Sequence, residues 1–267
     1  MADRFGFGKN WKQFLGSMNE ERRAEARQSL SEWLKMKDLT DKSFLDIGSG
    51  SGLFSLAARD LGATVDSFDY DKDCVECTQL LKKKYYPDDK SWKVESGDVL
   101  DRNYLSKYEQ HDIVYSWGVL HHTGNMYGAL ENAGNLVKNG GLLFIAIYND
   151  QGGFSTFWKV EKRIYNILPT PFKYLISFVF FIVLWTERSI IDLIKLRPFK
   201  SYIAYKKKRG MSPWYDAVDW VGGYPFEVAK PEEILDFFRE RGFELIKMGT
   251  NGGSNRCNQF VFRKTTE

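Results

Sequence analysis

The sequence predicts a doubly wound α/β fold, in which helices cover both faces of a mostly parallel sheet. Between residues 39 and 150, apolar segments of strand length alternate with segments of helical periodicity. The first of these strands, residues 44–47, runs directly into a glycine-rich turn and a helix. Acidic residues stand at the ends of the first three strands, so we expect carboxylates to gather at one edge of the sheet.

The glycine turn indicates the kind of ligand. Gly48, Gly50 and Gly52 alternate, so the backbone can lie against a ligand where any Cβ would collide. A dinucleotide fingerprint would need its third glycine at Leu53, and Asp46 at the strand's end would repel a diphosphate. A cation would be attracted, and S-adenosylmethionine (SAM) carries an ammonium, a sulfonium and no phosphate. An ordinary strand-helix corner would also account for the turn alone.

The second predicted strand, residues 63–71, ends in acidic residues, and Asp69 falls about 20 residues beyond the glycine turn. A doubly wound fold places an acidic residue there, and its carboxylate can accept from both hydroxyls of a ribose. Asp71 and Asp73 suit the first turn of the next helix, where the macrodipole favours negative charge.

The third predicted strand, residues 92–99, ends in the pair Gly97 and Asp98. An aspartate at this place can accept a hydrogen bond from an adenine amino group, while the backbone N–H of Val99 meets a ring nitrogen. The three strand ends together therefore suit an adenosyl compound.

In these motifs, and in residues 112–122, the chain resembles the class I SAM-dependent methyltransferases, over roughly residues 40–150. The resemblance implies a Rossmann-like core that binds SAM. It implies that the first strand end holds the methionine part, the second the ribose and the third the adenine, with the fourth strand's exit beside the methyl group. The cofactor residues expected on this basis are Asp46, Gly48, Ser49, Gly50, Asp69, Tyr70, Asp98, Val99 and Ser116.

Length and composition suit one α/β domain with an elaboration. The chain has 267 residues, of which 43% are hydrophobic, and a net charge of +3 that gives no reason to expect nucleic acid. We expect an N-terminal cover and helix (1–38), the SAM-binding core (39–150), an inserted cap (151–232), and a final helix with the closing hairpin (233–267), which makes seven strands.

The cysteines give no sign of a disulfide framework or a metal site. Cys74, Cys77 and Cys257 are odd in number, which suits a reducing cytoplasm. Cys74 and Cys77 lack a second pair for zinc and are expected to be neighbours on a helix face. No secretory leader is recognisable at the start of the sequence, so we expect a cytoplasmic protein.

The N-terminal segment allows two interpretations, and the end of the core has a recognisable helix–strand boundary. The aromatic, glycine-rich residues 4–15 precede a charged helix at 19–37, and either fold over the cofactor or pack on the sheet. A helix is expected to close on Gly140 and Gly141, before an all-apolar strand at 142–148.

The insertion holds an apolar run, residues 174–186, which is shorter than the roughly 20 residues of a membrane span. It could be a buried lid helix, a homodimer contact, or an interfacial anchor supported by the basic residues 206–209. Lid or oligomer contact is favoured over peripheral membrane contact through 172–209, because the basic residues are distant in the sequence and suit a solvated face.

The amino-acid sequence around residues 148–150, 220–227 and 257–260 resembles that of a subgroup of class I methyltransferases that modify sugars of bacterial polysaccharides and natural products. This resemblance implies a small polar acceptor, such as a sugar or a glycolipid head group, although the same aromatic residues could simply pack a cap. The candidate acceptor-binding residues are Tyr148, Asn149, Tyr224, Asn255, Arg256 and Asn258.

Methyl transfer to a hydroxyl needs a base, and His121 and His122 follow the fourth strand. Only one of them can face the pocket, and a buried histidine often serves packing alone. His111 is expected at the surface. An apolar acceptor such as a quinone or lipid, favoured by residues 174–186, and a catalytically inactive SAM-binding partner subunit stay open as alternatives.

Overall fold

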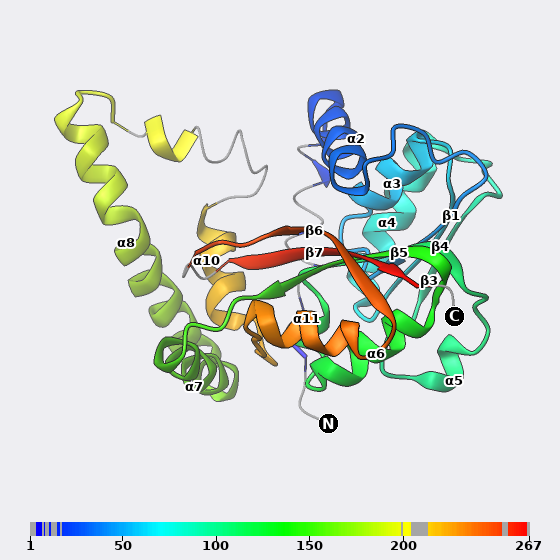
Figure 1. Cartoon of the computed structure of the whole chain (residues 1–267). Helices are drawn as coiled ribbons and strands as arrows, with labels where there is room; N and C mark the ends of the chain where they lie inside the picture. Colours follow the sequence, from blue (N-terminus) through cyan, green and yellow to red (C-terminus); the bar gives the residue numbers. More distant parts are fainter. Residues whose placement is uncertain are drawn as a thin grey trace.

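The computed structural model describes residues 4–6, 8, 11, 15–16, 18–198, 200–203, 213–252 and 256–265. Its centre is a seven-stranded sheet with the order β3-β2-β1-β4-β5-β7-β6 (Figure 1). β1 to β5 are parallel, and β7 lies antiparallel between β5 and β6. The predicted fold class is therefore confirmed. The strands are β1 (Ser43–Ile47), β2 (Thr64–Asp69), β3 (Trp92–Ser96), β4 (His111–Trp117), β5 (Val137–Tyr148), β6 (Phe243–Gly249) and β7 (Cys257–Lys264).

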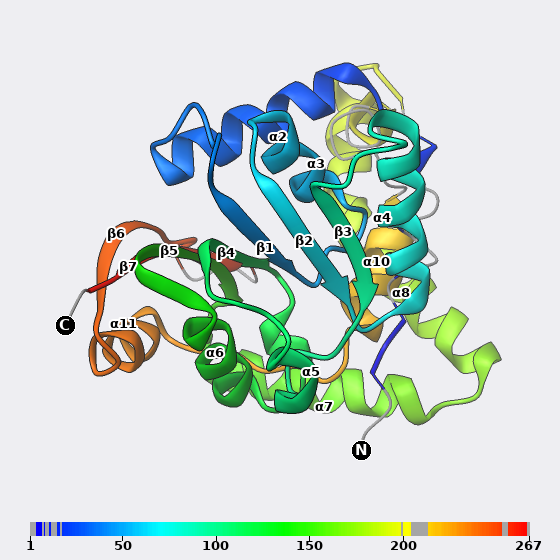
Figure 2. The ribbon, with the colours of Figure 1, turned by 90° about the vertical axis from the view of Figure 1, so that its right-hand side faces the viewer.

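Helices cover both faces of the sheet (Figure 2). The first three helices pack on one face, and the later ones on the other. Asp71 caps the helix after β2, with Asp73 in its first turn, and Cys74 and Cys77 lie buried on that helix, as predicted. The helices are α2 (Glu20–Leu34), α3 (Leu53–Asp60) and α4 (Lys72–Tyr85), then α5 (Arg102–Leu105), η1 (Leu120–His122), α6 (Met126–Asn135) and α11 (Pro231–Arg239).

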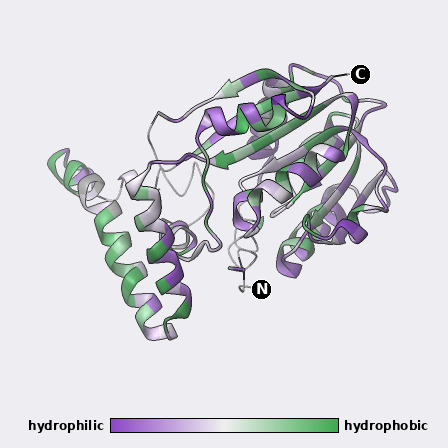
Figure 3. Cartoon of the chain, turned by 60° about the horizontal axis from the view of Figure 1, so that its bottom comes forward, coloured by the Kyte–Doolittle hydropathy of each residue, from purple (hydrophilic) through white to green (hydrophobic). Residues whose placement is uncertain are grey.

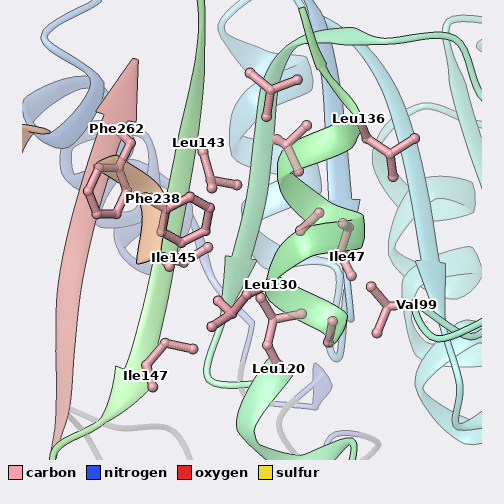
Figure 4. Close-up of a cluster of buried hydrophobic side chains, with 14 of the residues drawn as sticks. Ile47, Val99, Leu120, Leu130, Leu136, Leu143, Ile145, Ile147, Phe238 and Phe262 are labelled. Atoms are coloured by element: carbon pink, nitrogen blue, oxygen red, sulfur yellow. The ribbon is translucent and has the colours of Figure 1, made fainter. Parts of the chain in front are cut away.

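Side chains of the parallel strands alternate between two apolar clusters, one on each face. Leu45 and Ile47 pack with α6 and α11, whereas Phe44 packs with α2 and α3. Figure 4 shows the first cluster, with Phe238 and Leu130 between the sheet and its covering helices. Burial on both faces explains why these strands read as continuous apolar runs.

Two expectations about the core are wrong. The helix before β5 ends at Asn135, and Gly140 and Gly141 lie inside β5, because the strand begins at Val137 and absorbs the glycines. His111 is buried instead of exposed, because it begins β4 and its Nε2 lies 3.0 Å from Asp66 Oδ2. The pairing of β4 with β5 also shifts register directly after His111.

The insertion after β5 stands beside the sheet (Figure 1) and contains α7 (Gly153–Ile167), α8 (Thr170–Ile194) and α10 (Pro213–Gly222). α7 and α8 are joined by the hydroxyl groups of Tyr165 and Ser177, 3.0 Å apart. The apolar run at 174–186 lies within α8, and the basic run at 206–209 lies outside the described residues. No helix in the described part of the chain is long and apolar enough to cross a bilayer.

A charged cluster fastens α2 to α3. Asp60, whose side chain is 2% exposed, accepts from Arg23 Nε at 2.6 Å and from a terminal nitrogen at 2.5 Å. Arg27 lies 3.2 Å from the same carboxylate, and the Tyr86 hydroxyl donates to it at 2.8 Å. Asp60, at the end of α3, thus binds three side chains: two from α2 and one from the segment after α4.

We expect Asp60→Ala to lower the free energy of unfolding by about 2 kcal/mol, because two guanidinium groups lose a nearly buried partner. Urea unfolding followed by circular dichroism measures the change. Asp236→Ala, which breaks the exposed pair with Arg239 on α11, is the control and should change stability by less than about 0.5 kcal/mol. Equal losses in the two variants would contradict this role of Asp60.

Candidate active site

The turn after β1 is held tightly against the end of β2. The N–H of Gly48 donates to the Phe68 carbonyl at 2.8 Å, and the N–H of Gly50 donates to Asp69 Oδ2 at 2.9 Å. Gly48 has a φ of 79°, and a Cβ there would lie 2.5 Å from the Val119 side chain. Only glycine fits this position, as the alternating pattern predicted.

Two carboxylates lie buried beneath and beside this turn. Asp46 accepts from the Ser55 hydroxyl at 2.5 Å, and burial raises its pKa to about 7, with a contribution from Asp69. Burial likewise raises the pKa of Asp69 to about 6. Neither carboxylate forms an ion pair with a described side chain, so both are suited to attract a cationic ligand.

An open pocket of about 650 Å³ continues from β2 to the end of β3. Tyr70, the Ser96–Gly97 backbone and Asp98 line it on the sheet side, and Arg4 lines it on the other. Asp98 accepts from the N–H of Leu100 at 2.9 Å and pairs with Arg4 at 3.0 Å. The acid at the third strand end is therefore at the pocket wall, where the sequence placed it.

The remaining cofactor candidates mainly hold the strands together. The Ser116 hydroxyl donates to the Ile47 carbonyl at 2.9 Å, and Ser49 and Thr78 share a hydrogen bond of 2.9 Å. Val99 is buried, and its carbonyl accepts from Asn132. The described contacts of these side chains are structural, and a role in ligand binding for their backbones stays a prediction.

Described residues of the N-terminal segment run along the pocket. The Arg4 guanidinium lies 4.2 Å from the Tyr70 ring centre, and the N–H of Gly8 donates to Asp71 at 2.9 Å. The N–H of Phe5 donates to the carbonyl of Tyr224, in the last part of the insertion, at 2.9 Å. Farther along the same segment, Trp11 and Leu15 pack against the apolar cluster of α2 and α3, so the described residues show both the course along the pocket and packing on the core.

These residues fit SAM. The buried Asp46 below the glycine turn can balance the ammonium of the methionine part. Asp69 and Asp98 lie at successive strand ends, which suits a ribose followed by an adenine. The arrangement offers acceptors and negative charge, with no lysine or arginine of the described chain beside Asp46 or Asp69 to bind a phosphate.

The two histidines after β4 have opposite proton positions. His122 Nδ1 lies 2.7 Å from the Pro225 carbonyl, so Nδ1 carries the proton and Nε2 has the lone pair. His121 Nδ1 accepts from the Tyr148 N–H at 3.3 Å, so its proton is on Nε2. Burial lowers the pKa of His122 to about 4 and that of His121 well below its usual range, so both rings are neutral.

The insertion adds a buried polar group that the sequence analysis missed. Lys162 is 1% exposed, its Nζ lies 4.5 Å from the Trp220 ring centre and 5.0 Å from that of Phe226, and burial lowers its pKa. Burial raises the pKa of the neighbouring Glu161. A signal was available: Trp158, Lys162 and Tyr165 recur at helical spacing, which places the lysine on the inward side of α7.

Several buried polar atoms of the insertion and of the histidine segment lack a hydrogen-bond partner among the described residues. They are His121 Nε2, Trp220 Nε1, both Glu161 carboxylate oxygens and Glu227 Oε2. The Tyr148 ring connects two of these residues: its centre lies 4.0 Å from that of His121 and 5.8 Å from that of Trp220. We call this set, with Lys162, the cap cluster.

The other acceptor candidates lie near the ends of β5 and β7 or in the last part of the insertion. Asn149 Oδ1 accepts from Asn258 Nδ2 at 2.9 Å, so the two amides bind each other. Tyr224 is half-buried and contributes its carbonyl to Phe5, and Arg256 is exposed. Tyr148 alone joins the histidines by described contacts, and Asn255 lies outside the described residues.

Comparison with known proteins agrees with this geometry. Residues 18–247 match the model of a family described as a methyltransferase domain. Over 115 residues the chain is 30% identical to the ubiquinone biosynthesis O-methyltransferase of Glaesserella parasuis serovar 5 (strain SH0165), covering 43% of this chain and 49% of that protein. The chain thus matches about half the length of this relative.

Solved structures share the fold. Magnesium protoporphyrin IX methyltransferase from Synechocystis PCC 6803, solved with S-adenosylhomocysteine, superposes with a TM-score of 0.55 at 12% identity, covering 91% of this chain and 83% of that one. A putative methyltransferase from Bacillus halodurans C-125 gives the same TM-score of 0.55 at 12% identity, covering 91% of this chain and 99% of that one.

We expect Asp69→Ala to weaken the binding of S-adenosylhomocysteine about 30-fold, or about 2 kcal/mol, because a carboxylate that accepts from the ribose is lost. Isothermal titration calorimetry measures the dissociation constant. Asp66→Ala is the control, because Asp66 lies on the same strand but contacts His111 instead. Wild-type affinity in Asp69→Ala would assign the ribose to another residue.

Proposed function

The chain belongs to the methyltransferase domain family, and from this premise we propose that it transfers the methyl group of SAM to a hydroxyl oxygen of a small polar acceptor. A sugar or a glycolipid head group is such an acceptor. The observation that carries the proposal is the cap cluster, where unpartnered polar atoms lie buried among aromatic rings. Buried polar groups need partners, and an acceptor with several hydroxyls supplies them while its apolar face packs on the rings.

The histidines divide the work of binding and proton transfer. His122 is the general base: its Nε2 takes the proton of the acceptor hydroxyl, while Pro225 holds the ring through Nδ1. His121 donates from Nε2 to an acceptor oxygen and so orients it. When bound, SAM supplies a methyl carbon on a sulfonium, which an oxygen nucleophile attacks directly.

Lys162 supports this chemistry electrostatically. Its ammonium lies in an apolar setting against two aromatic rings, where an interaction with a developing negative charge on the acceptor oxygen is poorly screened. The same burial keeps water from competing for the methyl group. Entry of the acceptor therefore requires the insertion to move, because His121 is fully buried.

A second candidate is a hydroxylated quinone. The similarity to a ubiquinone biosynthesis O-methyltransferase favours it, and the aromatic rings of the cap cluster suit a flat ring. We would incubate the protein with SAM and two panels, nucleotide-linked sugars and hydroxylated quinones, and follow S-adenosylhomocysteine. Turnover on the sugars supports the first candidate, and turnover on the quinones alone replaces it. SAM binding without turnover on either panel would favour a non-catalytic partner subunit.

We expect His122→Asn to lower turnover at saturating SAM about 100-fold or more, because asparagine retains a donor for Pro225 but has no base at the Nε2 position. The affinity for SAM should be unchanged. His111→Asn is the control, since it also replaces a buried histidine but lies away from the site. Full activity of His122→Asn would remove this residue as the base.

The pH dependence gives an independent check of the same assignment. Because the pKa of His122 is lowered to about 4, its neutral form persists above that value. Turnover at saturating SAM and acceptor should therefore not fall as the pH is lowered from about 7 to about 6, so the usual histidine step near 6.5 is absent. A fall in turnover below about pH 6.5 would indicate a base with an ordinary pKa.

We expect His121→Gln to retain more activity than His121→Asn. Glutamine can place an amide N–H close to the position of the imidazole Nε2, whereas asparagine is too short to do so. The comparison is made as kcat/KM for the acceptor found in the panels. Equal losses in the two variants would show that His121 serves packing rather than hydrogen bonding.

A further inference from the structure

α8 presents a largely apolar side to solvent at the edge of the molecule (Figure 3). The exposed residues recur at helical spacing, and the opposite side buries Ser177 and Trp185. Exposed apolar faces of this extent are unusual on a soluble monomer and mark contact surfaces. Exposed members of the face are Leu175 (58%), Phe178 (52%), Val179 (53%), Ile182 (46%), Val183 (66%) and Ile194 (75%).

α7, which precedes α8, has an apolar side of the same kind. Phe154, Phe157, Ile164 and Ile167 are exposed, between 50% and 76%, at spacings of three and seven residues. Aromatic residues at such places suit the boundary between lipid head groups and acyl chains.

The exposed charges that the structure describes around these two helices have one sign. Among the side chains that the structure describes between residues 153 and 203, both acidic ones are turned inward. The Glu161 oxygens are buried, and Asp192 accepts from Ser201 at 2.6 and 2.7 Å. The exposed charges are basic: Lys159, Arg163, Lys195, Arg197 and Lys200.

We propose that the apolar side of α8, with that of α7, docks on a membrane surface that contains anionic lipids. Apolar side chains enter the head-group region while the basic residues meet lipid phosphates, which is the behaviour of an amphipathic helix lying in the plane of the membrane. None of the described helices combines the length and the apolarity that crossing a bilayer requires.

Charge favours a membrane over a second copy of the chain. In a symmetric dimer the same patch faces itself, so basic residues of one protomer would approach those of the other. The described part of the patch offers no exposed carboxylate to compensate them. Anionic head groups provide that compensation at every point of the surface. This inference concerns where the protein works and does not depend on the acceptor proposed above.

The test is co-sedimentation of the full chain with vesicles of phosphatidylcholine, with and without phosphatidylglycerol. We expect binding to the mixed vesicles, weaker binding to pure phosphatidylcholine, and weakening as sodium chloride is raised. Phe178→Asp and Val183→Asp should each reduce binding about tenfold, because an apolar side chain of this size loses its transfer out of water. Leu80→Asp is the matched control, since Leu80 is 49% exposed on α4, outside the patch.

The outcomes of this test distinguish a membrane from a second copy of the chain as the partner of the apolar side of α7 and α8. Absence of vesicle binding in the wild type, equal binding to neutral vesicles, or an equal loss in Leu80→Asp would overturn the proposal. A dimer in sedimentation equilibrium that Phe178→Asp dissociates would also overturn it and assign the face to a second copy. Circular dichroism checks that the variants are folded. If they are not, the dependence of wild-type binding on lipid charge and salt still tests the proposal.

Discussion

The site depends on keeping carboxylates buried at strand ends without basic partners. Asp46 and Asp69 lie out of water at the carboxyl edge of the sheet, and their pKa values rise to about 7 and about 6. Since a raised pKa means that ionisation is disfavoured in the folded chain, each carboxylate lowers stability once the pH exceeds its ordinary value. A cationic ligand reverses that cost, so binding and stability are linked through the same two side chains.

The parts of the site that the sequence could predict are those whose geometry is local in the chain. Asp46, Gly48 and Asp69 act through backbone geometry that is local to a strand and its following turn, and parallel strands bring such turns to one edge. Lys162 could not be assigned a role in the same way, because its environment comes from Trp220 on a helix far along the chain. His111 was misjudged for a similar reason, because its burial depends on Asp66 in the neighbouring strand.

The histidine pair shows what tertiary structure adds to a motif. The sequence indicated a base beside the fourth strand but could not distinguish two adjacent imidazoles. Their different tautomers arise from partners contributed by distant segments, the Pro225 carbonyl for His122 and the Tyr148 N–H for His121. Adjacent identical residues therefore have complementary capacities, one to accept a proton and one to donate a hydrogen bond.

One helix of the insertion, α7, takes part in both the proposed acceptor site and the proposed membrane contact. On α7, Trp158 and Lys162 face the cap cluster, whereas Phe157 and Ile164 face outward. A helix that packs by both sides transmits a displacement of one side to the other, because its backbone hydrogen bonds keep it rigid over this length. If a membrane holds the outward side, a displacement of α7 moves Lys162 relative to His121, which follows β4. Movement of the insertion, which the buried His121 requires for acceptor entry, would then be governed by the surface on which the protein rests.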